Sequence, residues 1–284
     1  MTTSSKQLVG HRIGTKTTGL IIATALSVAL HSASAATLYS TGFENPPFAN
    51  GSILLGQDGW STAIPPFLAP DAATITNTIA ASGLQSVRVR GADMVSAVEV
   101  DPYAAVGSYR KPLNYDTAAS GLQLVRVQAD VRLDGPVIGA GDFFSANIAA
   151  RSPDADVELS ISSDGIVYGY SPSGSTMFSA PISLNAWHTL GILVDFSANT
   201  YSYSVDGTSS GVFAFDAGIT SDVLLRESLV TYAFPDAGSN LRSNFTAYFD
   251  NVSATAVVPE PATAGLLTLG CVALLNFRRR HNGW

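Results

Sequence analysis

Acidic side chains recur at alternate positions near the middle of the chain. Asp154, Asp156 and Glu158 are spaced two residues apart, and in an extended strand such residues share one face. Two carboxylates placed about 5–10 Å apart are the groups that hydrolyse a glycosidic bond. The surrounding run, Ser152 to Leu159, is however typical of a solvated turn that leads into a strand. We therefore expect no catalysis from these acids.

A nucleophilic triad in the middle of the chain would have to use one histidine. His188 is the only histidine between Ala36 and Val258, so a Ser-His-Asp arrangement there requires it. It follows Trp187 in a predicted strand, and we interpret it as a structural or surface residue. The same region contains no cysteine, which excludes a metal site built from soft ligands. We expect a non-catalytic domain without a cofactor, in which calcium is the one metal that the carboxylates could hold.

An aromatic residue beside an acid is a second kind of candidate site. Sugar-binding modules present exposed aromatic rings, and the segment Gln57–Trp60 reads QDGW. Trp60 and Asp58 are therefore candidate glycan contacts. The alternative is that Trp60 packs in the core, as most aromatic residues of a β-sandwich do.

The segments that carry these residues alternate between apolar and polar side chains. Residues 122–133, 157–161 and 201–205 are examples, and such alternation is typical of half-buried antiparallel strands. Turn-forming pairs such as Asp164-Gly165 and Asp206-Gly207 separate the runs. No window predicts a long amphipathic helix. The pattern predicts an all-β fold, an antiparallel β-sandwich of jelly-roll type, over residues 36–257.

Short runs of this region resemble concanavalin A-like and laminin G-like jelly rolls. The runs are Trp187–Asp195 (WHTLGILVD), Tyr201–Gly207 (YSYSVDG), Gly42–Glu44 (GFE) and Tyr248–Val252 (YFDNV). The resemblance implies that the first and last strands of the domain are neighbours, and many secreted sandwiches hold these ends together with calcium. It makes Glu44 and Asp250 candidate ligands of a structural calcium. The alternative is two acids that face solvent.

The first 35 residues are typical of a secretory signal peptide. Basic residues precede the apolar run Leu20–Leu30, which is too short for a bilayer core that needs about 20 residues. Ala33 and Ala35 then form an A-x-A cleavage motif. We expect cleavage after Ala35 and export of the domain, with an uncleaved N-terminal anchor as the alternative.

Residues 258–284 predict a membrane segment with a basic end. The apolar run 262–277 is followed directly by Arg278, Arg279 and Arg280. As a helix, this run would be about 24 Å long, which snorkelling arginines extend to a single transmembrane helix. Because positive charge resists translocation, we expect the basic end to stay in the cytoplasm. The alternative is that residues 262–277 form a buried core helix.

The residues just before this run complete a three-part pattern. Pro259, Glu260 and Pro261, the apolar helix and the terminal arginines resemble the PEP-CTERM sorting signal of Gram-negative bacteria. The resemblance implies recognition by an exosortase, a membrane cysteine protease that processes the tail. It also implies a passage from the inner membrane to the cell envelope, outer surface or medium, in bacteria that make extracellular polysaccharide and biofilm.

The net charge of the middle region excludes some classes of binding partner. Between Ala36 and Val258 the chain has 9 Lys and Arg against 21 Asp and Glu, a balance of −12. This acidity argues against nucleic acid and anionic lipid, which need basic surfaces. We expect a non-enzymatic envelope or matrix protein that binds extracellular polysaccharide or presents a surface. A polysaccharide hydrolase or lyase and a purely structural surface protein are the alternatives.

Overall fold

The computed structural model describes most of the domain between the two predicted targeting segments. The described residues are 35–62, 72–94, 105–137, 143–171, 174–178, 181–215, 221–234 and 244–258. The chain divides into Met1–Ser34 and Ala35–Trp284, and every described residue belongs to the second unit. The predicted signal peptide and sorting segment, apart from Ala35 and Val258, lie outside the described residues. Within the described ranges, no helix has both the length and the apolar character needed to cross a membrane.

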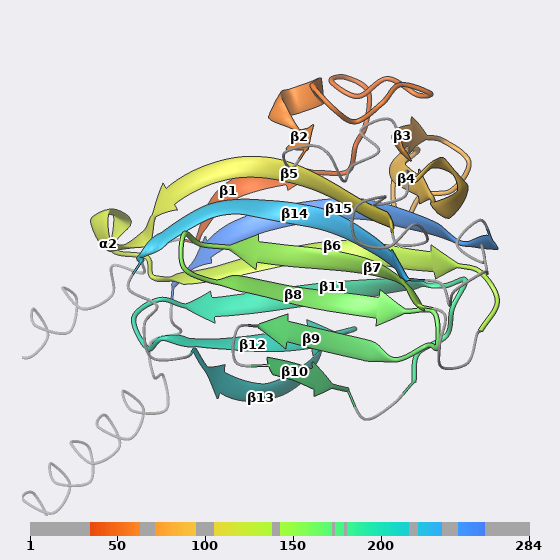
Figure 1. Ribbon diagram of the computed structural model, residues 1–284. Coiled ribbons are helices and arrows are strands. Elements are labelled where there is room, and N and C mark those ends of the chain that lie inside the picture. Colours follow the sequence, from red (N-terminus) through yellow and green to blue (C-terminus); the bar gives the residue numbers. More distant parts are fainter. Residues whose placement is uncertain are drawn as a thin grey trace, which may run out of the picture. The chain divides into compact units, whose positions relative to one another are not determined.

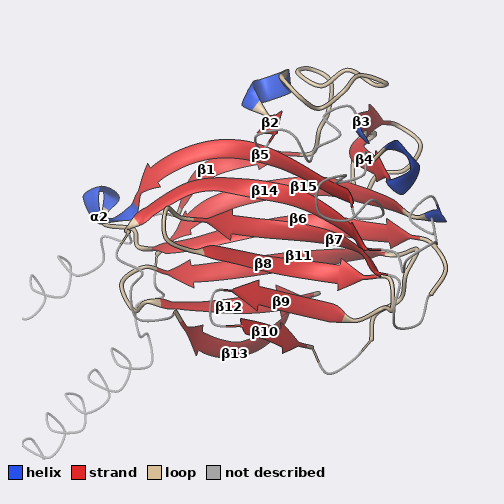
Figure 2. Ribbon diagram, in the orientation of Figure 1, coloured by secondary structure: helices blue, strands red, loops and turns tan. Residues whose placement is uncertain are grey.

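The described residues form two antiparallel sheets (Figures 1 and 2). The eight-stranded sheet has the order β13 (Thr208–Ala214), β12 (Thr200–Val205), β11 (Trp187–Asp195), β6 (Leu124–Asp134), β15 (Thr246–Val257), β4 (Ser86–Arg90) and β3 (Ala73–Thr76), with β1 (Ala36–Thr41) also paired to β15. The seven-stranded sheet has the order β10 (Gly174–Met177), β9 (Val167–Ser171), β8 (Asp156–Ser162), β7 (Phe143–Arg151), β14 (Val223–Phe234), β5 (Ala105–Asp116) and β2 (Ser61–Thr62). The predicted all-β sandwich is confirmed, and the first strand lies beside the last.

The two sheets pack face to face because their strands alternate. In β6, Val127 and Val131 are buried while Arg126 and Gln128 on the opposite face are not. Side chains of β6 and β11 meet those of β7 and β8 across the interface. Burying one large aliphatic side chain of this kind contributes about 1.5–3 kcal/mol. The core between the sheets therefore dominates the stability of the domain.

Turn chemistry places the strand ends where the sequence predicts. Asp206 and Gly207 both have positive φ, 49° and 78°, as the tight turn between β12 and β13 requires. The helical elements are short: η1 (Gln57–Gly59), η3 (Gly91–Asp93) and α2 (Thr117–Ser120). The Asp116 side chain caps α2 by accepting a hydrogen bond from the Ala119 N–H at 2.8 Å.

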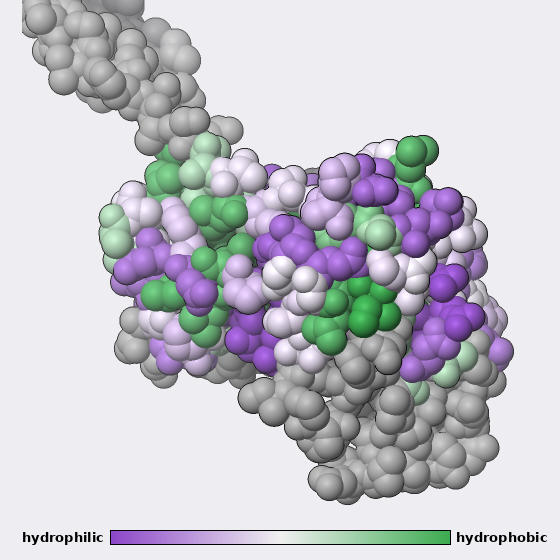
Figure 3. Space-filling view, turned by 90° about the horizontal axis from the view of Figure 1, so that it is seen from above, coloured by the Kyte–Doolittle hydropathy of each residue, from purple (hydrophilic) through white to green (hydrophobic). Residues whose placement is uncertain are grey.

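Exposed apolar side chains are scattered over the described residues. The large ones are Ile53, Leu84, Val137, Met177 and Val212, which lie on different elements. Seen from above, hydrophilic and hydrophobic residues are interspersed on the surface (Figure 3). The part of the chain that the structure describes thus offers no large apolar docking surface.

Candidate active site

The outer face of the seven-stranded sheet is polar across five strands. Its register explains why: Ile148 of β7 and its partners Leu159 and Leu229 point into the core, so the alternate residues of the same strands point outward. We call this surface the polar face. It consists of Ser108 and Arg110 on β5, Arg226, Ser228 and Tyr232 on β14, Ser145, Asn147 and Arg151 on β7, Asp156, Glu158, Ser160 and Ser162 on β8, and Tyr168 and Tyr170 on β9.

Glu158 lies at the centre of a hydrogen-bond network on the polar face. Its Oε1 accepts from Arg151 Nη2 at 2.8 Å and from the Tyr232 hydroxyl at 3.3 Å. Its Oε2 accepts from Asn147 Nδ2 at 3.2 Å. Three donors, one of them a guanidinium, fix the position of the carboxylate.

Asp156 is two residues away on the same face but has a different environment. Its Oδ2 lies 2.8 Å from Arg151 Nη2, whereas its Oδ1 is buried without a hydrogen-bond partner. Although two-fifths of the side chain is exposed (40%), this buried oxygen makes the charged form costly. Burial raises the pKa of Asp156 to about 6; the negative charge of Glu158 also raises it, against the opposing effect of Arg151. Asp156 can therefore carry a proton near neutral pH.

Three arginines crowd together beside these acids. Arg151 of β7 is the cross-strand partner of Arg226 of β14, and Arg110 of β5 follows on the next strand. Burial lowers the pKa of Arg226, and the charge of Arg151 lowers it further. The pKa of Arg110 is lowered by burial and then by both other arginines. The fold thus holds like charges close together on this surface.

The polar face also contains a high density of buried polar atoms without partners. They are the Nε atoms of Arg110, Arg151 and Arg226, Oδ1 of Asn147 and the hydroxyls of Ser108, Ser145, Ser160, Ser162 and Ser228. Native proteins pair the large majority of such atoms, because each unpaired one costs about 1–3 kcal/mol. The polar face therefore has hydrogen-bonding capacity that the fold itself does not use.

Asp156 and Glu158 have the arrangement of a glycosidase carboxylate pair. Asp156 Oδ2 and Glu158 Oε1 are each 2.8 Å from the same nitrogen of Arg151, so the two oxygens lie no farther apart than twice that distance. Retaining glycosidases place their two carboxyl groups about 5–5.5 Å apart. They also need one proton-carrying group, and the raised pKa of Asp156 suits it to that part.

The predicted turn that leads into a strand is confirmed in this run. Strand β8 begins at Asp156, so Asp156 and Glu158 share a strand face while Asp154 lies in the preceding turn. The arginines and Asn147 were missed; the only signal for them is their place at outward positions of predicted strands.

The predicted glycan contacts Trp60 and Asp58 lie on the opposite side of the seven-stranded sheet, near β1. Trp60 is 2% exposed and donates from Nε1 to the Tyr39 hydroxyl at 3.0 Å, which is the core-packing alternative. Asp58 accepts from the Tyr39 hydroxyl at 2.8 Å and lies 3.2 Å from Lys111 Nζ. A glycan contact at Asp58 stays a prediction.

Glu44 and Asp250, the predicted calcium ligands, both hold one loop. Glu44 Oε1 accepts from the N–H groups of Leu84 and Gln85 at 2.7 and 3.1 Å. Asp250 Oδ2 accepts from Ala81 and Ser82 at 2.9 and 3.1 Å. Among the described residues, no group of three or more His, Cys, Asp or Glu side chains is arranged to hold a metal ion. Structural calcium at this place stays a prediction.

His188 serves the end of the β11–β12 hairpin. Its Nδ1 lies 2.7 Å from Asp206 Oδ2 and its Nε2 lies 2.9 Å from the Ser183 carbonyl oxygen. Both ring nitrogens are therefore occupied, and neither faces a hydroxyl nucleophile. The interpretation of His188 as a structural residue agrees with this geometry.

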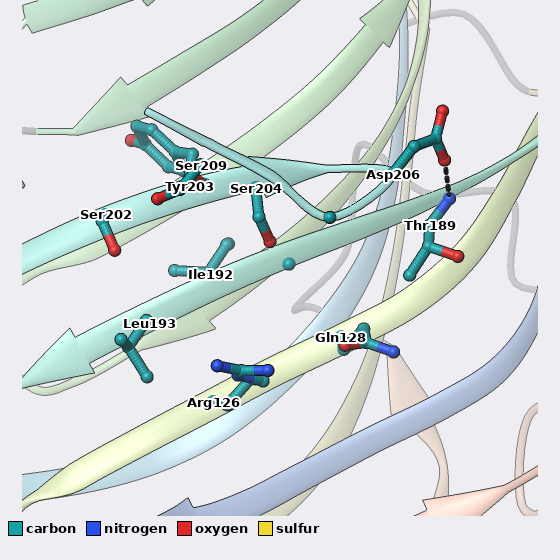
Figure 4. A pocket seen from close by; sticks show the side chains of 12 residues that line it. Arg126, Gln128, Thr189, Ile192, Leu193, Ser202, Tyr203, Ser204, Asp206 and Ser209 are labelled. Atoms are coloured by element: carbon teal, nitrogen blue, oxygen red, sulfur yellow. Dashed lines mark hydrogen bonds between the residues drawn. The ribbon is translucent and has the colours of Figure 1, made fainter. Parts of the chain in front are cut away.

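A hollow of about 530 Å³ lies on the other sheet, over β6, β11 and β12 (Figure 4). Small polar side chains such as Ser202, Ser204 and Gln128 line it. Its lining includes one carboxylate, Asp206, which accepts the Thr189 N–H at 2.8 Å (Figure 4) and contacts His188. Because this hollow lacks a second acid, the polar face is the better candidate for chemistry.

Comparison with known proteins adds information on the fold. No protein-family model matches the chain, and no curated protein matches it. An endo-1,3-beta-glucanase from Streptomyces sioyaensis is similar in structure, with a TM-score of 0.55 and 12% identity over 79% of this chain and 97% of that chain. A PL-14 alginate lyase from Aplysia kurodai has a TM-score of 0.50 and 12% identity over 78% of this chain and 99% of that chain.

These similarities correct one expectation. At 12% identity they establish the fold alone, a jelly roll that is also the fold of polysaccharide-cleaving enzymes. The expectation of a non-catalytic domain is wrong as an inference from this fold. The chain has a jelly-roll architecture.

Proposed function

We propose that the chain is an exported enzyme that hydrolyses glycosidic bonds of a polysaccharide on the polar face. The single observation that carries the proposal is the pair of Asp156 and Glu158, joined by Arg151 at 2.8 Å from an oxygen of each. In this proposal Glu158 is the nucleophile and Asp156 is the acid and base. Both would touch the reacting atoms and are the proposed catalytic residues.

The first step breaks the glycosidic bond. The Glu158 carboxylate forms a bond to the anomeric carbon, while protonated Asp156 gives its proton to the leaving glycosidic oxygen. The hydrogen bonds from Arg151 and Asn147 hold Glu158 oriented for this attack. Because its pKa is raised to about 6, the Asp156 side chain can carry and donate this proton near neutral pH.

The second step releases the enzyme. Asp156, now a carboxylate, takes a proton from water as the water oxygen bonds to the anomeric carbon and the ester to Glu158 breaks. The balance is one water consumed per bond cleaved, with retention of the anomeric configuration.

The test is release of reducing ends from bacterial extracellular polysaccharide by the purified full-length chain. Glu158→Gln and Asp156→Asn should each slow release by at least about a hundredfold. Asp93→Asn is the matched control, because Asp93 is also paired with an arginine, Arg90, at 2.6 Å but lies in η3, which follows β4 of the other sheet. Products with inverted configuration would overturn the nucleophilic role of Glu158, and products with a new carbon–carbon double bond would overturn the proposed hydrolysis.

We also propose the route by which the protein reaches its substrate. The signal-peptide motif at Ala33 and Ala35 and the pattern of Pro259, Glu260 and Pro261 before an apolar run support export and sorting by an exosortase, by way of the inner membrane, to the envelope or outer surface. Fractionation of cells with and without the exosortase tests this. Retention of an unprocessed, membrane-bound chain only in cells without the protease is the expected result, and full-length protein in the cytoplasm would contradict it.

A further inference from the structure

The domain is acidic overall, but its arginines are concentrated on one side of one sheet. Between Ala36 and Val258 the chain has eight arginines and a balance of −12, yet three of those arginines stand on three adjacent strands of the polar face. Among the described residues, two acids, Asp156 and Glu158, share that surface with them. An acidic protein thus has a locally basic surface at its candidate active site.

Within this cluster, one arginine forms the ion pairs with both acids. Arg151 contacts Asp156 and Glu158, while Arg110 and Arg226 form no ion pair among the described residues. The Nε atoms of both Arg110 and Arg226 are buried without a hydrogen-bond partner. The charge of Asp156 attracts both groups without forming an ion pair with either. Like charges held side by side with buried, unpaired Nε atoms destabilise a fold, so this arrangement needs a role besides stability.

A guanidinium group recognises a particular ligand chemistry. Its planar fork of N–H donors matches the two oxygens of a carboxylate, and it also binds the oxygens of a sulfate or phosphate ester. Two such groups side by side favour a ligand that carries repeated negative charge. A neutral sugar would leave the Arg110 and Arg226 guanidinium groups without an ion-pair partner.

The row of residues through Glu158 indicates how a polymer would lie. Across the strands the order is Tyr170, Glu158, Ala149, Ser228 and Arg110. At about 4.8 Å per strand this row is roughly 19 Å long. Tyr170 and Arg110 at its two ends are partly exposed, whereas Ala149 and Ser228 between them are buried, so the ends are the parts that a polymer can contact directly. The Tyr170 ring stacks with that of Tyr168 at 6.1 Å between centroids, which provides an aromatic surface at one end, opposite the arginines at the other.

We propose that the substrate is an acidic polysaccharide, whose anionic groups bind Arg110 and Arg226 while its backbone crosses Glu158. This inference deepens the proposed function and rests on it for the place of cleavage, but binding can be measured separately. The shared chemistry is an anionic oxygen group on a sugar. A uronic-acid carboxylate and a sulfate ester are its two sources, and the experiment separates them.

The experiment measures binding by the full-length chain carrying Glu158→Gln, so that the polymer is not cut. The probes are polygalacturonate, dextran sulfate and neutral dextran. We expect R110Q and R226Q to weaken binding of one acidic probe about tenfold or more, and to reduce the salt dependence of that binding. The probe that responds identifies carboxylate or sulfate as the recognised group.

Controls keep loss of folding apart from loss of binding. R126Q removes an arginine from the outer face of the other sheet and should leave binding unchanged. R110K and R226K keep the positive charge but lose the planar guanidinium donors. They should bind the acidic probe more strongly than R110Q and R226Q but more weakly than the chain with both arginines. Equal binding of neutral and acidic probes, or no effect of R110Q and R226Q in folded protein, would overturn the inference.

The two proposals can fail separately. If the acidic probe binds through Arg110 and Arg226 but no polysaccharide is cleaved by the unsubstituted protein, the proposed hydrolysis is wrong and the substrate class stands. If a neutral glucan is cleaved and acidic polymers are not, hydrolysis stands and the acidic substrate is wrong.

Discussion

Asp156 and Glu158 project from the same face of β8, each with an oxygen 2.8 Å from one guanidinium nitrogen. Adjacent outward positions of a strand bring two carboxylates close, and the shared cation Arg151 holds them there. Their environments differ, because Glu158 also accepts from Asn147 and Tyr232, whereas Asp156 keeps a buried oxygen without a donor. This difference underlies the predictions about cleavage.

Cleavage should fall as the pH rises above about 6. Asp156 must be protonated to assist the leaving group, and burial raises its pKa to about 6. The protonated fraction then decreases about tenfold for each further pH unit. The measurement is kcat/KM against pH for the full-length protein. A rate that stays constant from pH 6 to 9 would remove Asp156 from this role.

Asn147 should act as a positioning residue for the nucleophile. Its Nδ2 donates to Glu158 Oε2 at 3.2 Å, so Asn147→Ala removes one of the donors that orient the carboxylate. We expect kcat about ten- to hundredfold lower with KM nearly unchanged. Asn147→Asp, which places a carboxylate beside that of Glu158, should lower kcat at least as far. An unchanged kcat with reduced stability would mean a structural role only.

The stability of the domain should decrease between about pH 4.5 and 8 because of Glu227. This side chain is 1% exposed, opposite Lys111 across β14 and β5, and neither carboxylate oxygen has a hydrogen-bond partner. Burial raises its pKa from 4.5 to about 8, against the opposing charge of Lys111. In that interval the folded state holds a proton that the unfolded state has lost, so stability falls as the pH rises.

The matching substitution is Glu227→Gln, which keeps the shape and removes the titration. It should flatten this dependence and stabilise the protein at pH 8, by an amount on the order of a few kcal/mol. Thermal unfolding at pH 5 and pH 8 measures the effect, with exposed Asp93→Asn as the control. A variant whose melting temperature still falls between these pH values would show that another group is responsible.

Trp60 should contribute to stability rather than to glycan binding. It is buried, and its ring lies 6.0 Å from that of Phe43 and 6.2 Å from that of Tyr39. Trp60→Ala should destabilise the domain by about 3–5 kcal/mol, and Trp60→Phe by less. Chemical unfolding gives these values, and glycan binding by the Phe variant should equal that of the unsubstituted chain. Binding lost in a stably folded Phe variant would restore Trp60 as a contact.

His188→Ala should leave cleavage intact. The ring joins Asp206 to the Ser183 carbonyl, far in the topology from the polar face, so its removal costs hydrogen bonds worth about 1–3 kcal/mol. Melting temperature and activity measured together test this. Abolished activity at unchanged stability would point to a triad after all.

The sequence by itself determined the strands and the faces they present. Alternation in residues 124–133 dictates which side chains enter the core, and Asp206-Gly207 dictates a tight hairpin. Both are local properties, since the period of a strand and the φ angles of a turn depend on a few neighbouring residues. The all-β sandwich followed from them.

The tertiary structure alone decided which polar residues meet. Arg110, Arg151 and Arg226 come from segments far apart in the chain, and only the order β7, β14, β5 with its register places them on adjacent strands. Strand order and register are set by the packing of the whole sheet against its partner, which no local pattern records. For the same reason the exact start of β8 at Asp156, and with it the carboxylate pair, became visible only in the fold.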